Sequence, residues 1–156
     1  MFELEIPGFG AVRLQHLVSD FTGTLSVDGR LLPGVEERLN RIAEFLGIHV
    51  LTADTFGSAR EELKGVRCDL HVLEGDRHDI RKEAYVNTLS AGSVIAFGNG
   101  SNDRKMLRAS RVGVAVCLAE GCAADAAMSA DILVTSITDG LDLLLNPKRC
   151  KATLRF

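Results

Sequence analysis

The sequence predicts an α/β fold in which a mainly parallel sheet is flanked by helices. Short apolar runs of strand character alternate with segments of helical spacing along most of the chain. Four loops that follow or lie near these runs carry polar side chains, and in a parallel sheet such loops open on one edge. A length of 156 residues suggests a single domain, residues 1–156, with one core.

The first element is an expected β-hairpin, residues 2–6 and 11–14, because two apolar segments flank Pro-Gly-Phe-Gly. After it, the expected strands cover residues 15–19, 48–52, 70–73, 94–97, 112–116 and 132–134. The expected helices cover residues 34–46, 59–63, 79–89, 103–109, 122–128 and 141–145. Gly47 is expected to stop the first helix.

Two further expectations concern packing. In the helix over 79–89 the apolar side chains are expected to face inward; they are Ile80, Ala84 and Leu89. The basic cluster at 148–151 reads most simply as a solvated tail, and the last helix is expected to end before Pro147.

Composition bounds the class of protein. Hydrophobic residues make up 46% of the chain and charged residues 25%, which is typical of a globular domain. A formal net charge of -3 gives no reason to expect nucleic acid or an anionic membrane as a partner. No apolar run approaches the roughly 20 residues of a membrane helix, and the acidic start lacks the basic character of a secretion signal. A cytoplasmic protein is therefore expected, with its four cysteines as free thiols.

Asp20 is the most informative residue. It follows the expected central strand directly, and a turn containing Gly23 and a hydroxyl comes next. At the carboxyl end of a strand, a carboxylate is presented where open α/β sheets bind ligands. It can act there as a nucleophile toward phosphorus or as a metal ligand.

Three other elements complete a set suited to phosphoryl transfer, which needs a nucleophile, phosphate-holding groups, a cation and a metal site. Thr52 ends a strand and supplies a hydroxyl, and Lys82 near the start of a helix supplies positive charge. Asn99 and Asp103, in the loop after the strand over 94–97, supply oxygen ligands suited to Mg²⁺. Each residue alone has an ordinary reading as a turn, helix cap or surface charge, but their order favours chemistry.

These motifs resemble the haloacid dehalogenase superfamily of phosphotransferases, and most closely the phosphorylation domain of P-type ATPases and their small soluble relatives. Residues 20–25 (Asp-Phe-Thr-Gly-Thr-Leu) resemble Asp-Lys-Thr-Gly-Thr-Leu, with Phe21 in place of Lys. Residues 51–54 resemble the Thr-Gly-Asp element, and residues 97–103 resemble Gly-Asp-Gly-x-Asn-Asp. Lys82 falls where the phosphate-binding Lys is expected, and the likeness covers nearly the whole chain.

The resemblance implies a Rossmann-like sheet, Mg²⁺ as cofactor and an aspartyl-phosphate intermediate on Asp20. The implied catalytic residues are Asp20, Thr22, Thr52 and Lys82. The implied phosphate-binding residues are Thr52, Ala53 and Lys82. The implied metal ligands are Asp20, the backbone carbonyl of Thr22, Asn99 and Asp103.

Three departures from the family pattern matter. Residues 25–51 leave no room for the nucleotide-binding domain of the pumps or for a cap, so an ion pump is excluded for this chain alone and a homo-oligomer is possible. Thr22 stands where family phosphatases usually have Asp as general acid and base, a role worth about 10²–10⁴-fold. Asn99 replaces a charged metal ligand, which predicts weaker Mg²⁺ binding.

The leading hypothesis is a slow, capless, Mg²⁺-dependent phosphohydrolase that acts through an aspartyl-phosphate on a small phosphorylated substrate or a phosphoprotein. Substrate choice is expected to lie in the loops 26–33 and 56–58. The alternative is a catalytically weak or inactive regulatory domain that binds phosphate, which Thr22 and Asn99 both favour. A generic nucleotide- or flavin-binding domain is disfavoured because the first loop lacks the paired glycines of a dinucleotide fingerprint.

Overall fold

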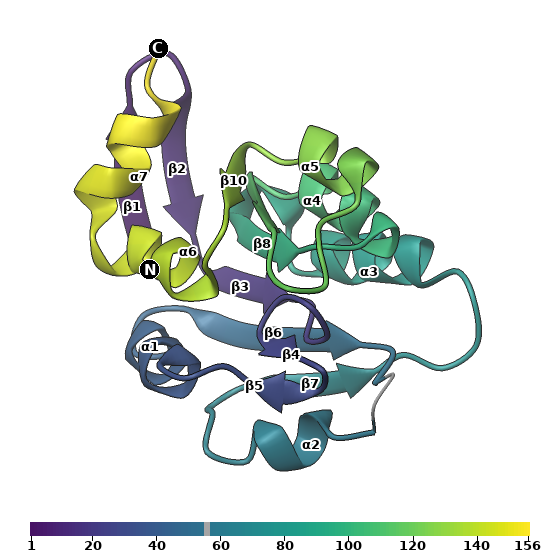
Figure 1. Cartoon of the computed structure of the whole chain (residues 1–156). Coiled ribbons are helices and arrows are strands. Elements are labelled where there is room, and N and C mark those ends of the chain that lie inside the picture. Colours follow the sequence, from purple (N-terminus) through teal and green to yellow (C-terminus); the bar gives the residue numbers. More distant parts are fainter. Residues whose placement is uncertain (55–56) are drawn as a thin grey trace.

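The computed structural model describes residues 1–54 and 57–156, and its centre is a six-stranded parallel sheet (Figure 1). The strand order is β10-β9-β8-β3-β6-β7. The bounds are β3 (His16–Ser19), β6 (Gly47–Thr52), β7 (Asp69–Val72), β8 (Val94–Gly98), β9 (Val112–Val116) and β10 (Ile132–Val134). The expected α/β class is confirmed, and β3, which leads to Asp20, lies between β6 and β8.

Helices cover both faces of the sheet, because successive strand residues point to opposite faces. On one side, Leu17 and Phe97 belong to the larger apolar cluster; on the other, Val18 and Ala96 belong to the smaller one. The larger cluster packs under α1 (Val35–Ile42), α2 (Ala59–Glu62) and α6 (Ile137–Leu145). The smaller cluster packs under α3 (His78–Thr88), α4 (Arg104–Ala109) and α5 (Ala124–Ser129), and a single 3₁₀ turn, η1 (Ala91–Ser93), precedes β8.

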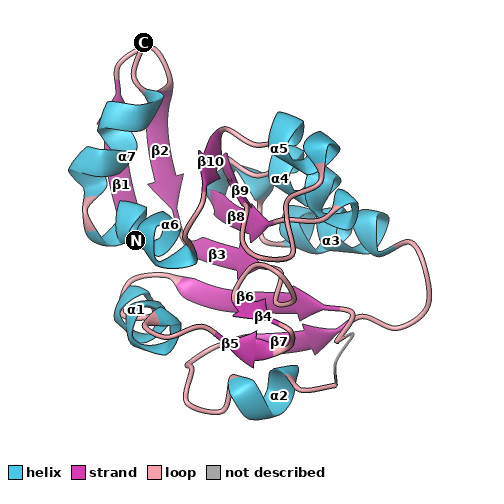
Figure 2. Ribbon diagram, in the orientation of Figure 1, coloured by secondary structure: helices cyan, strands magenta, loops and turns pink. Residues whose placement is uncertain are grey.

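The N-terminal hairpin forms a separate two-stranded sheet from β1 (Phe2–Ile6) and β2 (Gly10–Leu14), as expected (Figure 2). The solvated tail expected at the C-terminus is wrong. Residues Pro147–Leu154 form helix α7, which packs against β1 and buries Cys150 and Leu154. The expected end of a helix before Pro147 is confirmed, because α6 ends at Leu145. Pro147 also begins α7, since proline suits the first helical turn, where no N–H is needed.

A second small hairpin, β4 (Ser26–Val27) and β5 (Arg30–Leu31), follows Asp20 and was not foreseen. Its tip uses left-handed backbone at Asp28 (φ 53°) and Gly29 (φ 79°), as in a tight two-residue turn. In the described chain this hairpin is the only folded insertion between β3 and α1, so no large cap is present there. Of the two loops expected to set specificity, 26–33 contains this hairpin, whereas part of 56–58 lies outside the described residues.

The inward face of α3 differs from the expected one. Ile80 is 40% exposed and Ala84 is also exposed, whereas Lys82 and Val86 are buried. The apolar spacing misleads here because the side chain buried in the first turns is a charged lysine that finds partners in the site. None of the described helices has the length and apolar character that a membrane crossing needs.

Candidate active site

Asp20 lies just beyond the carboxyl end of the central strand, as the sequence predicts. Its N–H donates to the carbonyl of Phe97 on β8 at 3.0 Å, which fixes the backbone beside the sheet. The chain then wraps around the carbonyl of Phe21, which accepts the N–H of Thr24, Leu25 and Ser26 at 3.0–3.2 Å. The Phe21 ring is 1% exposed and belongs to the larger apolar cluster, so this position is a core position in this chain.

Lys82 is the buried cation of the site. Its side chain is 1% exposed, and Nζ lies 3.1 Å from Asp20 Oδ1 and 2.7 Å from Asp103 Oδ1. Nζ also donates to Asn102 Oδ1 at 3.2 Å, so three acceptors surround one ammonium group. A buried charge with this many partners is held in one place, because leaving it unpaired would be strongly unfavourable.

The charges of the site are not balanced. Burial and, next, the neighbouring Asp103 raise the pKa of Asp20, Lys82 offsets only part of this, and the net value is about 7. Burial alone would lower the pKa of Lys82, but Asp20 and Asp103 together raise it above its ordinary value. One ammonium therefore faces two carboxylates, and an additional cation would favour the ionised form of Asp20.

Asp103 is fully buried behind Lys82. Its Oδ1 accepts from Lys82, and its Oδ2 accepts the N–H of Asn99 and of Gly100, each at 3.0 Å. Gly98 is required beside it, because a Cβ there would collide with the Asp103 side chain. These contacts favour a role in holding Lys82 and the loop, which includes the single 3₁₀ turn η2 (Ser101–Asp103). The expectation that Asp103 is a metal ligand stays a prediction.

Thr52 and Ala53 end β6 at the same edge of the sheet. The Thr52 side chain is nearly fully buried, and its Oγ1 accepts the N–H of Asp54 at 2.9 Å. Asp54 has a left-handed backbone (φ 52°), and its Oδ1 accepts the N–H of Ala59 at the start of α2 at 3.0 Å. Asp54 is thus hydrogen-bonded within its own loop.

Asn99 connects three loops. Its Oδ1 accepts the Thr24 hydroxyl at 3.1 Å, and its Nδ2 donates to the carbonyl of Gly121 at 3.2 Å. Gly23 lies against it with φ 78°, and a Cβ at that position would collide with the amide. An aspartate at position 99 could accept from Thr24 but could not donate to Gly121.

One cavity of about 210 Å³ brings the predicted site residues together. Its lining residues are Asp20, Thr22, Thr52, Ala53, Lys82, Asn99, Gly100, Asn102 and Glu120. Of the predicted site residues, all but Asp103 line this cavity; Asp103 lies behind Lys82, in the loop after β8 at the same edge of the sheet. The catalytic, phosphate-binding and metal-binding roles of these residues stay predictions. The sequence assigns no site role to Asn102 or Glu120, although Asn102 stands inside the fourth motif.

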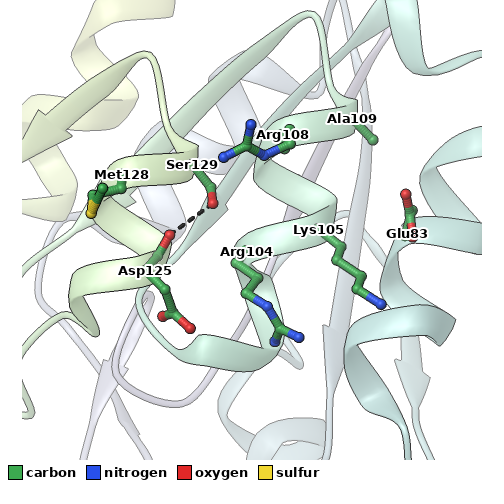
Figure 3. A pocket seen from close by; sticks show the side chains of 8 residues that line it. All are labelled: Glu83, Arg104, Lys105, Arg108, Ala109, Asp125, Met128 and Ser129. Carbon is green, nitrogen blue, oxygen red and sulfur yellow. Dashed lines mark hydrogen bonds between the residues drawn. The ribbon is translucent and has the colours of Figure 1, made fainter.

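A larger hollow, of about 660 Å³, lies between α3, α4 and α5 (Figure 3). Its lining residues are Glu83, Arg104, Lys105, Arg108, Ala109, Asp125, Met128 and Ser129. Two of its basic side chains, Arg104 and Lys105, already pair with Asp79 at 3.1 and 3.2 Å. None of the motif residues lines this hollow, so the smaller cavity is the candidate active site.

A chain of hydrogen bonds braces the helix that carries Lys82. Tyr85, one turn after Lys82 on α3, bonds through its hydroxyl to His49 Nδ1 on β6 at 2.9 Å and to His71 Nε2 on β7 at 2.8 Å. His49 Nε2 in turn lies 3.1 Å from His16 Nδ1 on β3. Burial lowers the pKa of both His16 and His49. The sequence shows these histidines as scattered, and only the fold brings them together.

Comparisons with known proteins agree with this fold. No family model matches the chain. "Uncharacterized protein MJ0073" of Methanocaldococcus jannaschii is 47% identical over 62 residues, which are 40% of this chain and 67% of that protein. A putative HAD family hydrolase from Streptomyces avermitilis superposes with a TM-score of 0.69 at 18% identity, over 87% of each chain.

Two other solved structures extend the comparison. The 3-deoxy-D-manno-octulosonate 8-phosphate phosphatase of Moraxella catarrhalis, in complex with magnesium and phosphate, has a TM-score of 0.65 at 16% identity, over 92% of this chain and 95% of that one. The catalytic domain of the CPx-ATPase CopB-B has a TM-score of 0.60 at 25% identity, over 74% of this chain but 46% of that one. The chain therefore belongs to the family of MJ0073, and it has the fold of the haloacid dehalogenase-type hydrolases.

Proposed function

We propose that this protein is a metal-dependent phosphohydrolase in which Asp20 is the nucleophile. The observation that carries the proposal is the buried ammonium of Lys82, held between Asp20, Asn102 and Asp103 at the carboxyl end of the central strand. A structural scaffold has no physical need for this arrangement, because burying charged groups is costly. A site that must stabilise the charge of a phosphoryl group does need it.

The residues around Asp20 divide the work of phosphoryl transfer. An oxygen of Asp20 attacks phosphorus, while the Thr52 hydroxyl and the N–H of Ala53 hold phosphoryl oxygens. Lys82 offsets the negative charge that spreads over those oxygens in the transition state. Asp103, with both oxygens accepting hydrogen bonds, keeps Lys82 and the fourth motif in place.

The donor atoms fit a hard divalent cation such as Mg²⁺. Asp20, the carbonyl of Thr22 and Asn99 offer oxygen atoms from the same cavity, which Mg²⁺ prefers. Within residues 1–54 and 57–156, no group of three His, Cys, Asp or Glu side chains is placed to hold a metal ion, so the proposed set relies on carbonyl and amide oxygens beside Asp20. The bound cation would supply charge neutralisation of the phosphoryl group.

The proposal is tested with p-nitrophenyl phosphate and acetyl phosphate, with and without Mg²⁺. We expect hydrolysis that needs Mg²⁺ and is lost in Asp20→Asn. The matched control is Asp76→Asn, which makes the same charge change at an exposed side chain and should leave the rate unchanged. Equal Mg²⁺-dependent rates in wild type and Asp20→Asn would exclude Asp20 as the nucleophile.

The regulatory alternative has its own support in the site. Thr22 has no acid–base capacity near neutral pH, and Asn99 has no charge, so a phosphoenzyme could persist. A phosphorylated Asp20 that survives for minutes, with little release of phosphate, would favour a sensor over a phosphatase. The possible homo-oligomer and the phosphoprotein substrate stay predictions.

A further inference from the structure

Hydrolysis of an aspartyl-phosphate is faster when a nearby group takes a proton from the attacking water, and the usual position for that group in this cavity has none. Thr22, at the usual place for that group, has a hydroxyl that neither gives nor takes a proton near neutral pH. Asn99 and Asn102 are amides and do not titrate. Thr55 and Phe56, which lie outside the described residues, have side chains without a group that titrates near neutral pH.

Two titratable side chains other than Asp20 line the described cavity, and they are Lys82 and Glu120. Lys82 stays charged, because its ammonium donates to three oxygen acceptors and has no lone pair to offer. The imidazole of His78 lies one turn before Lys82 on α3, but it is not among the residues that line the cavity. Glu120 is the remaining candidate.

The backbone of Glu120 is fixed to the fourth motif. Glu120 occupies the corner of a tight turn closed by the N–H of Gly121 and the carbonyl of Leu118 at 2.9 Å, with Gly121 at φ 80°. Asn99 holds this turn twice: its Nδ2 donates to the Gly121 carbonyl at 3.2 Å, and its carbonyl accepts the N–H of Ala123 at 2.8 Å. The turn is therefore joined directly to Asn99 of the site.

The side chain of Glu120 is also oriented. Its Oε2 accepts the N–H of Asp28, at the tip of the β4–β5 hairpin, at 3.3 Å. Among the described residues Oε1 has no hydrogen-bond partner, so one oxygen is tethered and the other is open to a proton. The carboxylate is exposed, so water reaches it.

We propose that Glu120 is the general acid and base of this site, in place of the missing carboxylate at position 22. The inference rests on the proposed function. In the first step an oxygen of Asp20 bonds to phosphorus, the bond from phosphorus to the leaving-group oxygen breaks, and that oxygen takes the proton of the Glu120 carboxyl group. In the second step Glu120 takes a proton from water as the water oxygen bonds to phosphorus, and the bond between phosphorus and Asp20 breaks. The products are an alcohol and inorganic phosphate, and both carboxyl groups return to their starting states.

The proposal also explains why position 99 holds an amide rather than a carboxylate. An aspartate there would place a second acceptor against the carbonyl of Gly121, and the turn that carries Glu120 would lose its donor. The two departures from the family pattern, at positions 22 and 99, are then linked: the amide holds the turn, and the turn supplies the carboxylate.

The test separates the two half-reactions with radiolabelled acetyl phosphate. Acetate leaves without a proton, so Glu120→Gln should form the phosphoenzyme at the wild-type rate and lose it about 10²-fold or more slowly. Gln keeps an oxygen for the N–H of Asp28, so this variant changes the proton chemistry and not the tether. Glu120→Ala should recover part of its dephosphorylation rate when formate is added, which a purely structural role would not produce.

Two control variants accompany it. Glu44→Gln, at an exposed position on the turn after α1, should behave as wild type. Dephosphorylation by Glu120→Gln at the wild-type rate, or a loss found in His78→Gln instead, would overturn the role of Glu120 alone. A wild-type protein that forms no phosphoenzyme and hydrolyses neither p-nitrophenyl phosphate nor acetyl phosphate would overturn the proposed function together with it.

Discussion

Replacing Asp20 by Asn should stabilise the metal-free protein at neutral and basic pH. Burial and then Asp103 raise the pKa of Asp20 from its ordinary 3.8 to about 7, so ionising this side chain opposes folding. The folded state holds the proton up to about pH 7, while the unfolded chain releases it near pH 4. The folded state therefore binds more protons across this window, and the free energy of unfolding falls as pH rises.

The magnitude follows from the size of that rise. At 1.36 kcal/mol per pH unit, a shift from 3.8 to about 7 corresponds to about 4 kcal/mol. Asn is neutral and has the shape of a protonated Asp, so the variant has no buried side chain to ionise at position 20 and avoids this loss of stability. The variant should exceed wild type by about 2 kcal/mol at pH 5 and about 4 kcal/mol at pH 8. In a chain of 156 residues that is roughly 8 to 16 °C in melting temperature at pH 8.

The assay is urea unfolding in EDTA, followed by circular dichroism between pH 5 and 8. Asp76→Asn makes the same charge change at an exposed position and should stay within about 0.5 kcal/mol of wild type. Mg²⁺ at 100 times its dissociation constant should raise the free energy of unfolding of wild type by about 2.7 kcal/mol and that of Asp20→Asn only slightly. The reasoning fails if the variant is no more stable than wild type at pH 8, or if their difference does not grow with pH.

Three other substitutions test the same contacts. Lys82→Met removes the ammonium between two carboxylates and should destabilise the protein by about 3–5 kcal/mol at pH 8 and abolish hydrolysis, as measured by urea unfolding and phosphate release. Gly23→Ala forces a side chain into left-handed backbone at φ 78° and against Asn99, so thermal unfolding should show a loss of at least about 1 kcal/mol; an unchanged melting temperature would contradict the close approach. Tyr85→Phe removes the hydroxyl that bonds to His49 and His71, and urea unfolding should show that the free energy of unfolding falls by about 1–2 kcal/mol. A smaller loss would show that water replaces the hydroxyl.

Much of the fold could be predicted because the buried strands of a parallel sheet can be recognised in the sequence as short apolar runs. The strands at Val112–Val116 and Ile132–Val134 have the expected bounds. The C-terminal helix could not be foreseen, because its sequence is basic and only Cys150 and Leu154 reach the core. Its stability comes from packing on the N-terminal hairpin, a contact between the two ends of the chain.

The site divides in the same way. Asp20, Thr52 and Asn99 could be placed at one edge because the carboxyl ends of parallel strands meet there. Lys82 could be placed only by its order among the four elements and by the resemblance, since its own helix suggests that the apolar Ile80 faces inward. Glu120 could not be found at all, because its position depends on a turn that Asn99 holds across the fold.

The hydrogen-bonded chain through Tyr85 has a consequence for ligand affinity. It ties α3, which carries Lys82, to β6, which carries Thr52, through His49, so the two groups proposed to hold phosphate belong to elements that are joined directly. Binding then needs little ordering of the protein, and less of the interaction free energy is spent on immobilising side chains. A site assembled in advance can retain a small anion such as phosphate even without a lid to close over it.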